Sequence, residues 1–490
     1  MNYKTMKKSL VLLLSFVLLF SFSLTANASI DQGWTTCAGM TEGKAYLGVQ
    51  SIGDNIFTFG GQTNYAWPFS LDKYIGSTGS WQNVNGSYTY MTENWASAAC
   101  NNKLYLFGNG YDYESRTNVD SYDPETGLRQ WVASGYGELP FAPATAVVGE
   151  KIYILGGGQG NTYDCTNEVK VFNTATGNFT NSDPMFTPVM PSARGLHSAA
   201  TVNGKIYVMG GRIAGQLTNT VEEYNPLTNT WTEKASMPVA RDSFAAVSAG
   251  NKILVIGGKN DQGILDTIDV YDPATDSWSS LNCSLSSPRY GLSAAFVNGN
   301  LYVAGGKGAD HYTCLTTFEK LNLTPAIPIN TSSIPNPDAL TLTWDAVIGA
   351  TSYDVEFDGV IKSVAGTQDL VNGLLPETEH VIRIRAVNEY GLSDWSQPLT
   401  VSTLPLPNVD IPTNVSASTA IVISWNVIQG ATGYDIEVDG AVIDNKLSTQ
   451  YIHTNLIQRT THTYRIRARI GSTVSPWGEL IEIPSVQNNQ

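Results

Sequence analysis

The stretch Asn203-Gly204-Lys205-Ile206-Tyr207-Val208-Met209-Gly210-Gly211 decides the fold, because its pattern returns at regular intervals along the chain. Each copy is an apolar run of strand length that ends in a glycine pair or, once, in Gly-Asn. The first glycines of the six copies are Gly60, Gly108, Gly156, Gly210, Gly257 and Gly305. Successive copies are 47 to 54 residues apart, a period typical of arrays of supersecondary units. The sequence therefore predicts six repeats of one β unit.

The second half of each repeat carries a tyrosine and a tryptophan on either side of a turn. After Tyr224 comes Asn225-Pro226-Leu227-Thr228-Asn229, and Trp231 follows. Asn and Pro favour a tight turn, so the two aromatic residues flank a hairpin. Four short strands in each repeat are typical of a blade in a β-propeller.

These marks strongly resemble the Kelch repeat. The resemblance implies an all-β propeller, in which the glycines allow tight backbone turns and the aromatic residues pack the blades. The aromatic pairs are Tyr74/Trp81, Tyr122/Trp131, Phe172/Phe179, Tyr224/Trp231 and Tyr271/Trp278.

The sixth repeat has Phe318 but no tryptophan after it, and the missing strand occurs near the start of the chain. Trp34-Thr35-Thr36-Cys37-Ala38-Gly39-Met40 matches the segment from Trp231 to Met237. We therefore expect residues 29–40 to supply the outer strand of the last blade. This pairing would close a six-bladed propeller over residues 29–324 and remove its open edge.

Residues 1–28 have the features of a signal peptide. Basic residues precede an apolar run from Leu10 to Leu24, and Ala26-Asn27-Ala28 is a suitable cleavage site. The run is short for a membrane span and is interrupted by serines. We expect a secreted, extracellular protein without a membrane span. The small number of cysteines is more typical of a bacterial secreted protein.

After Leu321 the period changes to two segments of about 80 residues that resemble each other. The segment from Thr343 to Asp354 matches the segment from Ser424 to Asp435. Both resemble fibronectin type III modules, which implies two β-sandwiches, at residues 325–404 and 405–486. His380 and His462 stand where that family usually has a tyrosine, and we expect this change to weaken the tyrosine-corner hydrogen bond.

Composition and motifs exclude several classes of function. The formal charge of −15 makes a nucleic-acid partner improbable. No phosphate-binding loop, nucleophile elbow or metal-ligand motif occurs, so we expect no cofactor and no bound metal. The sequence nominates no catalytic residue, and we expect a monomer.

Seven cations occupy equivalent positions in neighbouring repeats. Four leading cations stand sixteen residues before a glycine pair, and three trailing cations follow a pair directly. They are Lys44, Arg194, Arg241 and Arg289, then Arg212, Lys259 and Lys307. In Kelch propellers the equivalent positions line one mouth of the central channel, so the resemblance implies an anionic ligand, either an acidic carbohydrate or a protein loop. The alternative is that the arginines make structural hydrogen bonds between blades, and the sequence leaves both interpretations open.

Cys37 and Cys314 form a possible disulfide across the closing blade. Superposing the sixth repeat on the fourth places Cys37 at the position of Lys234 and Cys314 at that of Thr220. These positions nearly face each other in a hairpin. The alternative is two buried thiols.

The leading functional hypothesis is a secreted, non-catalytic recognition protein with fibronectin type III spacers. The rival hypothesis is a carbohydrate-active enzyme that resembles N-acetylneuraminate mutarotase. In that case Arg194, Arg241 and Arg289 would clamp a carboxylate, with Glu93 or Asp242 near the mouth. A third hypothesis is a scaffold for partner proteins, because fold alone does not choose among functions.

Overall fold

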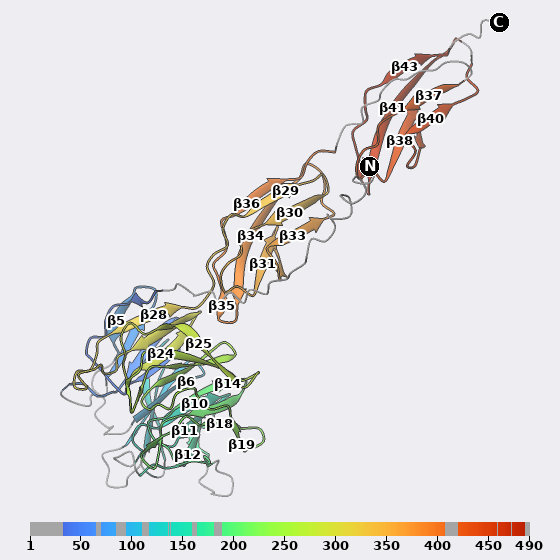
Figure 1. The fold of residues 1–490 in the computed structure, drawn as a ribbon. Coiled ribbons are helices and arrows are strands. Elements are labelled where there is room, and N and C mark those ends of the chain that lie inside the picture. Colours follow the sequence, from blue (N-terminus) through green and yellow to red (C-terminus); the bar gives the residue numbers. More distant parts are fainter. Residues whose placement is uncertain are drawn as a thin grey trace, which may run out of the picture. The chain divides into compact units, whose positions relative to one another are not determined.

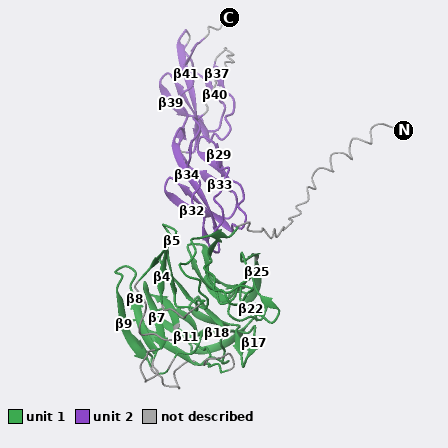
Figure 2. Cartoon of the chain, turned by 90° about the vertical axis from the view of Figure 1, so that its left-hand side faces the viewer, with its two compact units in different colours: residues 1–323 green, residues 324–490 purple. Residues whose placement is uncertain are grey.

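The computed structural model describes residues 33–64, 70–84, 95–109, 117–135, 137, 139–158, 164–180, 189–406, 420–457, 459–471 and 473–485. These residues form strands and turns, and no helix occurs among them. They belong to two compact units, residues 1–323 and residues 324–490 (Figure 2). The predicted signal peptide, residues 1–28, lies outside the described residues.

The described part of the first unit contains six four-stranded antiparallel sheets, numbered here in chain order (Figure 1). Sheet 1 contains β2 (Gly48–Ile52), β3 (Asn55–Phe59), β4 (Leu71–Ile75) and β5 (Ser80–Asn83). Sheet 2 contains β6 (Trp95–Cys100), β7 (Lys103–Asn109), β8 (Thr117–Tyr122) and β9 (Arg129–Gly135). Sheet 3 contains β10 (Ala144–Val148), β11 (Lys151–Leu155), β12 (Val169–Asn173) and β13 (Asn178–Phe179).

The next two sheets each carry a small additional hairpin after the glycine pair. Sheet 4 contains β14 (Ser198–Val202), β15 (Lys205–Met209), β18 (Val221–Asn225) and β19 (Thr230–Lys234), with the hairpin β16 (Arg212–Ile213) and β17 (Gln216–Leu217). Sheet 5 contains β20 (Ala245–Ala249), β21 (Lys252–Ile256), β24 (Thr267–Asp272) and β25 (Ser277–Ser284), with the hairpin β22 (Lys259–Asn260) and β23 (Gly263–Ile264).

Sheet 6 combines the two ends of the first unit. It contains β26 (Ser293–Val297), β27 (Asn300–Ala304), β28 (Phe318–Asn322) and, at its outer edge, β1 (Thr35–Thr36). Thr35 pairs with Lys320 and Thr36 with Glu319. The segment that the sequence assigned to the closing strand therefore lies on β28, as far as its residues are described.

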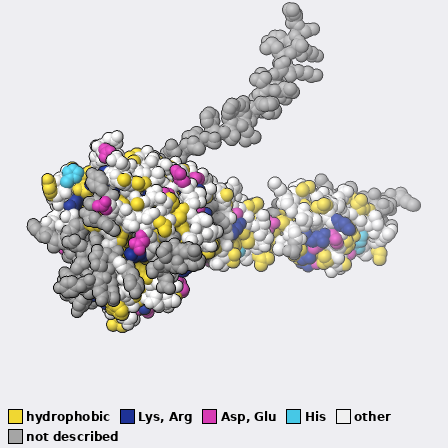
Figure 3. Space-filling view, turned by 90° about the horizontal axis from the view of Figure 1, so that it is seen from below, with side chains coloured by type: hydrophobic (Ala, Val, Ile, Leu, Met, Phe, Trp, Pro, Cys, Tyr) yellow, Lys and Arg dark blue, Asp and Glu magenta, His cyan; other side chains and the backbone are white. Residues whose placement is uncertain are grey.

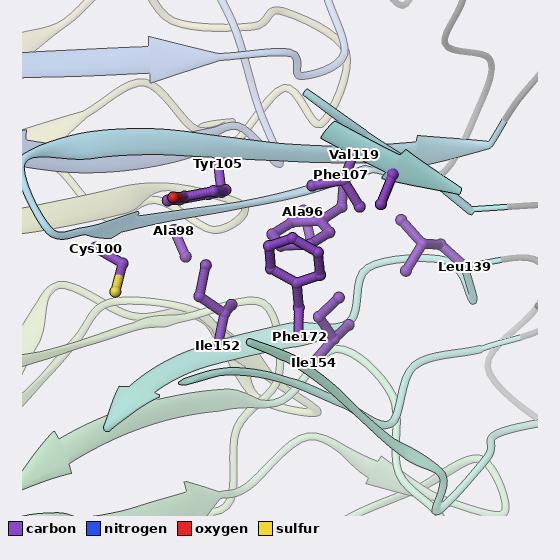
Figure 4. Packing of buried hydrophobic residues seen from close by; sticks show 11 residues of the cluster. Ala96, Ala98, Cys100, Tyr105, Phe107, Val119, Leu139, Ile152, Ile154 and Phe172 are labelled. Carbon is purple, nitrogen blue, oxygen red and sulfur yellow. The ribbon is translucent and has the colours of Figure 1, made fainter. Parts of the chain in front are cut away.

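The first strands of the six sheets contact one another in a closed cycle. β2 contacts β6, β6 contacts β10, β10 contacts β14, β14 contacts β20, β20 contacts β26, and β26 contacts β2. Alternate side chains of each sheet pack against the sheets on either side. Between sheets 2 and 3, for example, the rings of Phe107 and Phe172 meet edge to face at 5.7 Å beside Ile152 and Ile154 (Figure 4).

The glycine pairs allow a close approach of two backbone segments. Gly210 and Gly211 have φ angles of 56° and 84°, which are strained for residues with a Cβ. A Cβ on Gly211 would lie 2.5 Å from the Gly195 carbonyl oxygen. The Tyr–Trp pairs also contact as expected, since the rings of Tyr224 and Trp231 are 4.9 Å apart. The repeated marks are therefore packing and turn residues.

The second unit contains two groups of strands with similar topology. In the first, β29 (Ser332–Pro335), β30 (Ala339–Thr343) and β33 (Gln368–Asn372) form one sheet, and β31 (Ser352–Phe357), β32 (Val360–Val364), β34 (Glu379–Asn388), β35 (Gly391–Leu392) and β36 (Leu399–Ser402) form the other. In the second, β37 (Ile421–Ser424) pairs with β40 (Gln450–His453), and the other sheet contains β38 (Gly433–Val438), β39 (Ala441–Asp444), β41 (Thr461–Ile470), β42 (Thr473–Val474) and β43 (Ile481–Pro484).

The histidines at the corner positions make bonds of their own. His380 Nδ1 lies 2.7 Å from Asp358 Oδ2, and its Nε2 lies 2.8 Å from Thr378 Oγ1. His462 has the same relation to Asp439 and Thr460. The expected loss of corner bonding is therefore offset, because an aspartate in the hairpin turn between β31 and β32, and its counterpart between β38 and β39, supplies a partner.

We expect the second group of strands to lose stability as the pH falls below about 6.5. Burial lowers the pKa of His453, and the neighbouring His462 lowers it further. A group whose pKa is lower in the folded state stabilises the fold above its unfolded pKa, about 6.5 for histidine, and that contribution is lost on acidification. Hydrogen exchange of residues 450–470, corrected for intrinsic rates, should show weaker protection at pH 5.5 than at pH 7.5.

The variant His453→Val is the matched control, because Val371 occupies the equivalent strand position in the first group. It should abolish most of the pH dependence. An unchanged pH dependence in this variant would show that another group is responsible.

Candidate functional site

A cavity of about 430 Å³ lies among the first strands of the six sheets. All six sheets, or the turns that precede them, contribute residues to its wall. Most of the described lining residues are small or carry a hydroxyl or amide group. They include Gln50, Ser97, Thr145, Ser198, Ala246 and Ser293. A volume of this size is within the range of binding sites for small groups.

A collar of backbone hydrogen bonds surrounds part of the cavity mouth. Ser243 N donates to Leu196 O at 2.9 Å, Gly291 N donates to Ser243 O at 2.7 Å, and Tyr46 N donates to Gly291 O at 2.6 Å. Each of these residues lies two positions after a leading cation and has a φ angle between 53° and 63°. This left-handed conformation is uncommon for residues other than glycine. The collar thus links sheets 4, 5, 6 and 1 through main-chain atoms.

The four leading cations are buried and paired inside their own sheets. The side chains of Arg194, Arg241 and Arg289 are 0% exposed, and that of Lys44 is 1% exposed. Each pairs with a carboxylate on the third strand of its sheet. The pairs are Lys44–Asp72 at 2.6 Å, Arg194–Glu222 at 3.0 Å, Arg241–Asp269 and Arg289–Glu319.

In the Arg241–Asp269 pair, burial and the charge of the partner shift each pKa in opposite directions. Burial lowers the pKa of Arg241, and the Asp269 carboxylate opposes that shift. Burial also raises the pKa of Asp269, against the effect of Arg241. Each partner therefore depends on the other to remain charged away from water.

The two sheets without a leading cation differ from the others in a consistent way. Sheet 2 retains the third-strand carboxylate, Asp120, which pairs instead with Arg129 on the outer strand. Sheet 3 has Pro140 at the leading position, and Lys170 replaces the carboxylate and pairs with Glu168. Among the described positions, therefore, a leading cation is present in each sheet whose third-strand carboxylate has no other cation to pair with. This arrangement favours the structural interpretation that the sequence left open.

The three trailing cations have different surroundings. Arg212 Nε lies 2.6 Å from Asp242 Oδ2, so its charge is compensated. Lys259 Nζ lies over the ring of Tyr290, 4.4 Å from its centroid. Lys307 forms a backbone bridge with Tyr290. Within the described part of the chain, Lys259 and Lys307 make no salt bridge. Of the seven predicted cations, these two have no carboxylate partner; Lys259 is partly exposed and Lys307 is 9% exposed.

Aromatic residues accompany these two lysines; we call Tyr46, Lys259, Tyr290, Lys307 and His311 the mouth cluster. The rings of Tyr46 and Tyr290 are 6.4 Å apart, and those of Tyr290 and His311 are 5.8 Å apart. Burial raises the pKa of Tyr46 to about 12, so its phenol stays neutral. Tyr312 follows His311 and is 85% exposed. The tyrosines of this group are not among the predicted site residues, although Tyr290 stands next to the leading cation Arg289 and Tyr46 stands two residues after Lys44.

His197 is the histidine among the described residues that line the cavity. It is 7% exposed, and burial and the nearby Arg194 lower its pKa to about 3. The imidazole is therefore neutral at physiological pH. Both ring nitrogens lack a well-formed hydrogen bond, and the Leu155 carbonyl only partly offsets the effect of burial on the pKa.

The predicted disulfide does not form, and the register of sheet 6 explains why. Cys37 and Cys314 are free thiols. Cys37 N bonds to Phe318 O, whereas the backbone of Cys314 lies against Gly43. The loop after Gly305-Gly306 is longer than its counterpart in sheet 4, so Thr317, not Cys314, takes the place of Thr220 in bonding the first glycine of the pair.

The described residues offer few groups for metal binding or for acid–base chemistry. The described residues contain no cluster of three or more His, Cys, Asp or Glu side chains able to hold a metal ion. None of them belongs to a helix long and apolar enough to span a membrane. Glu93, a candidate acid or base, lies outside the described residues, and Asp242 is buried in its pair with Arg212. Where Figure 3 shows described atoms of the first unit, acidic and basic side chains are interspersed.

Comparisons with known proteins identify two kinds of domain. Residues 94–306 match the KLHDC2/KLHL20/DRC7 Kelch-repeats domain, and residues 328–402 match the fibronectin type III domain. The chain therefore contains a Kelch-repeat domain and, after it, a fibronectin type III domain.

Several curated proteins are similar to parts of this chain. The tail tube protein gp17.1* of Bacillus phage SPP1 is 38% identical over 85 residues, which are 16% of this chain and 31% of that protein. Fibronectin type III domain-containing protein 7 of Homo sapiens is 28% identical over 169 residues, 32% of this chain and 22% of that protein. The collagen alpha-1(XII) chain of Oryctolagus cuniculus is 33% identical over 75 residues, 15% of this chain and 11% of that protein. The chain spans less than a third of the length of each.

Proposed function

We propose that this Kelch-repeat and fibronectin type III protein is a secreted, non-catalytic recognition protein that binds a partner protein at the cavity mouth. Both kinds of domain suggest protein binding. The observation that carries the proposal is the mouth cluster. It combines aromatic side chains with two lysines that have no carboxylate partner. Its Tyr46 lines the cavity, and the exposed Tyr312 follows its His311 in the chain. Tyrosine side chains at such a mouth suit a protein interface, and the two lysines can attract an acidic group on the partner.

We propose that the chain forms a six-bladed propeller followed by two fibronectin type III modules. The closed cycle of first strands and the pairing of β1 with β28 support six blades. The second module is supported by the equivalent rings of Trp344–Tyr353 and Trp425–Tyr434, 5.4 Å and 5.6 Å apart. In this proposal the modules act as spacers.

The anionic part of the ligand is proposed to contact Lys259 and Lys307. The other five cations of the predicted site are already paired with carboxylates, so they have little charge to offer a ligand. The same pairing removes the carboxylate clamp that the mutarotase alternative required from Arg194, Arg241 and Arg289. We therefore favour an acidic residue on a protein loop as the group that meets the two lysines.

A selection from a displayed library of disulfide-closed peptide loops tests this function on the full mature chain. Tyr312→Ala should weaken binding of the selected loops at least tenfold, because exposed tyrosines at interface centres contribute strongly. Lys259→Gln should weaken the binding of loops that carry an acidic residue, and it should reduce the salt dependence of that binding. Dissociation constants measured by surface plasmon resonance report both effects.

Leu227→Ala is the matched control, since Leu227 is 95% exposed but lies in the turn between β18 and β19. It should leave binding unchanged. Selected loops that bind Tyr312→Ala and Lys259→Gln as well as the unaltered protein would contradict a binding site at the mouth.

A further inference from the structure

The wall of the cavity is uncharged although its surroundings are not. Among the described residues that line it, none carries an Asp, Glu, Lys or Arg side chain. The leading cations approach the same region but are paired within their sheets, so each presents a dipole instead of a net charge. His197 remains neutral. A charged group inside the cavity would therefore lose hydration without meeting a counter-charge, which disfavours its binding there.

The hydrogen-bonding groups of the wall are not all used by the protein. Ala99 N donates to Gln50 Oε1, and Thr145 Oγ1 donates to Ser97 O, so these side chains join sheets 1, 2 and 3. Ala246 N donates to Ser198 Oγ between sheets 4 and 5. The hydroxyl of Ser293 makes no such bond within the described structure. It is partly exposed and belongs to β26, directly after the turn that carries Tyr290.

The unused hydroxyl of Ser293 therefore lies three residues after Tyr290 of the mouth cluster. A backbone amide offers one donor and one acceptor, which a serine hydroxyl can match. A neutral imidazole likewise offers one donor and one acceptor. Small uncharged side chains, such as those of Gly, Ser, Ala or Asn, would add little volume to a peptide in a cavity of about 430 Å³. A chain terminus would bring an ammonium or a carboxylate, whereas an internal loop brings neither.

From these observations we infer that the partner inserts the tip of an internal loop into the cavity, that this tip is uncharged, and that the acidic contact to Lys259 and Lys307 comes from the shoulder of the loop. This inference rests on the proposed function, because it assigns the specificity of the same mouth. It divides recognition between a charged rim and an uncharged interior.

Synthetic disulfide-closed loops from the selection described above test the inference. Each selected loop is remade with Asp or with Lys at its tip, and its affinity for the full mature chain is measured. Either charge at the tip should weaken binding at least tenfold. An acidic residue moved to the shoulder should be tolerated or favoured.

The variant Ser293→Asp converts the test into a change of specificity. A carboxylate in the wall should increase the affinity for the Lys-tipped loop at least tenfold. It should decrease the affinity for the Asp-tipped loop further. Ser293→Ala is the matched control and should leave the preference for uncharged tips unchanged. The melting temperature of each variant shows whether the propeller remains folded; if Ser293→Asp does not fold, the tip series on the unaltered protein decides alone.

The outcomes separate the inference from the function on which it rests. If affinity is indifferent to tip charge and to Ser293→Asp, while Tyr312→Ala still weakens binding, the partner contacts only the rim and the inference is wrong. If Tyr312→Ala and Lys259→Gln also have no effect, the mouth is not the binding site and the proposed function fails as well. Strong binding of free chain termini in place of closed loops would also overturn the inference.

Discussion

Arg241→Ala should destabilise the first unit strongly and should leave ligand affinity nearly unchanged. The guanidinium is fully buried and pairs with Asp269, so its removal leaves a carboxylate buried without a counter-charge. Breaking a buried pair in this way costs about 3–5 kcal/mol. In a unit of this size, such a loss lowers the melting temperature by roughly 10 °C. Differential scanning calorimetry of the full chain measures the effect.

Two further variants distinguish pairing from a binding role. Arg241→Met combined with Asp269→Leu removes both charges and should recover much of the stability lost in Arg241→Ala, because an apolar pair of similar volume often replaces a buried ion pair well. Lys259→Gln lacks such a buried partner and should change the melting temperature little. If Arg241→Ala kept its stability but lost affinity for the selected loops, the leading cations would belong to the ligand site after all.

Removing residues 29–40 should open the closed cycle of sheets. Cys37 N, Met40 N and Lys44 N bond to carbonyls between Leu315 and Phe318. Trp81 Nε1 bonds to Ala38 O at 2.8 Å. Deleting residues 29–40 breaks the bonds made by Cys37, Ala38 and Met40, at about 0.5–1.5 kcal/mol each. It also removes the buried Met40, whose burial stabilises by about 1.5–3 kcal/mol.

The expected result is a loss on the order of 5 kcal/mol together with aggregation. The deletion leaves β28 as an unpaired edge and uncovers the packed rings of Phe318, Tyr74 and Trp81, and such edges promote association. Size-exclusion chromatography and thermal unfolding report both changes. Replacing residues 29–33 alone, which precede β1, is the control and should be mild. A deleted protein that stays monomeric and equally stable would contradict closure by this segment.

Much of the fold follows from local sequence signals. The glycine pairs and the Tyr–Trp pairs are local features whose spacing repeats, and each has the backbone angle or ring contact that its chemistry requires. The match of Trp34–Met40 to Trp231–Met237 was also enough to place the closing segment on β28. The predicted position of Cys314 in sheet 6 was wrong, because the loop before β28 differs in length from its counterpart in sheet 4.

The surroundings of the cations could be predicted less well, because pairing joins strands that are distant in the sequence. A signal was nevertheless present: Asp72, Glu222 and Asp269 each stand 28 residues after a leading cation, and Glu319 stands 30 after Arg289. That spacing indicates a cation and a carboxylate on the same sheet. The collar and the mouth cluster had no comparable signal, since they depend on left-handed turns at Tyr46, Leu196 and Ser243 that the residue types do not favour.

Hydrogen–deuterium exchange of the full chain, with and without a selected loop, tests recognition at the mouth most directly. The account predicts that the loop increases protection in residues 243–246, 290–294 and 307–315, the segments that carry the collar, β26 and the mouth cluster. It predicts no change in the outer strands β19 and β25 or in residues 324–490. Protection confined to the outer strands or to the second unit, with residues 290–294 and 307–315 unchanged, would contradict it.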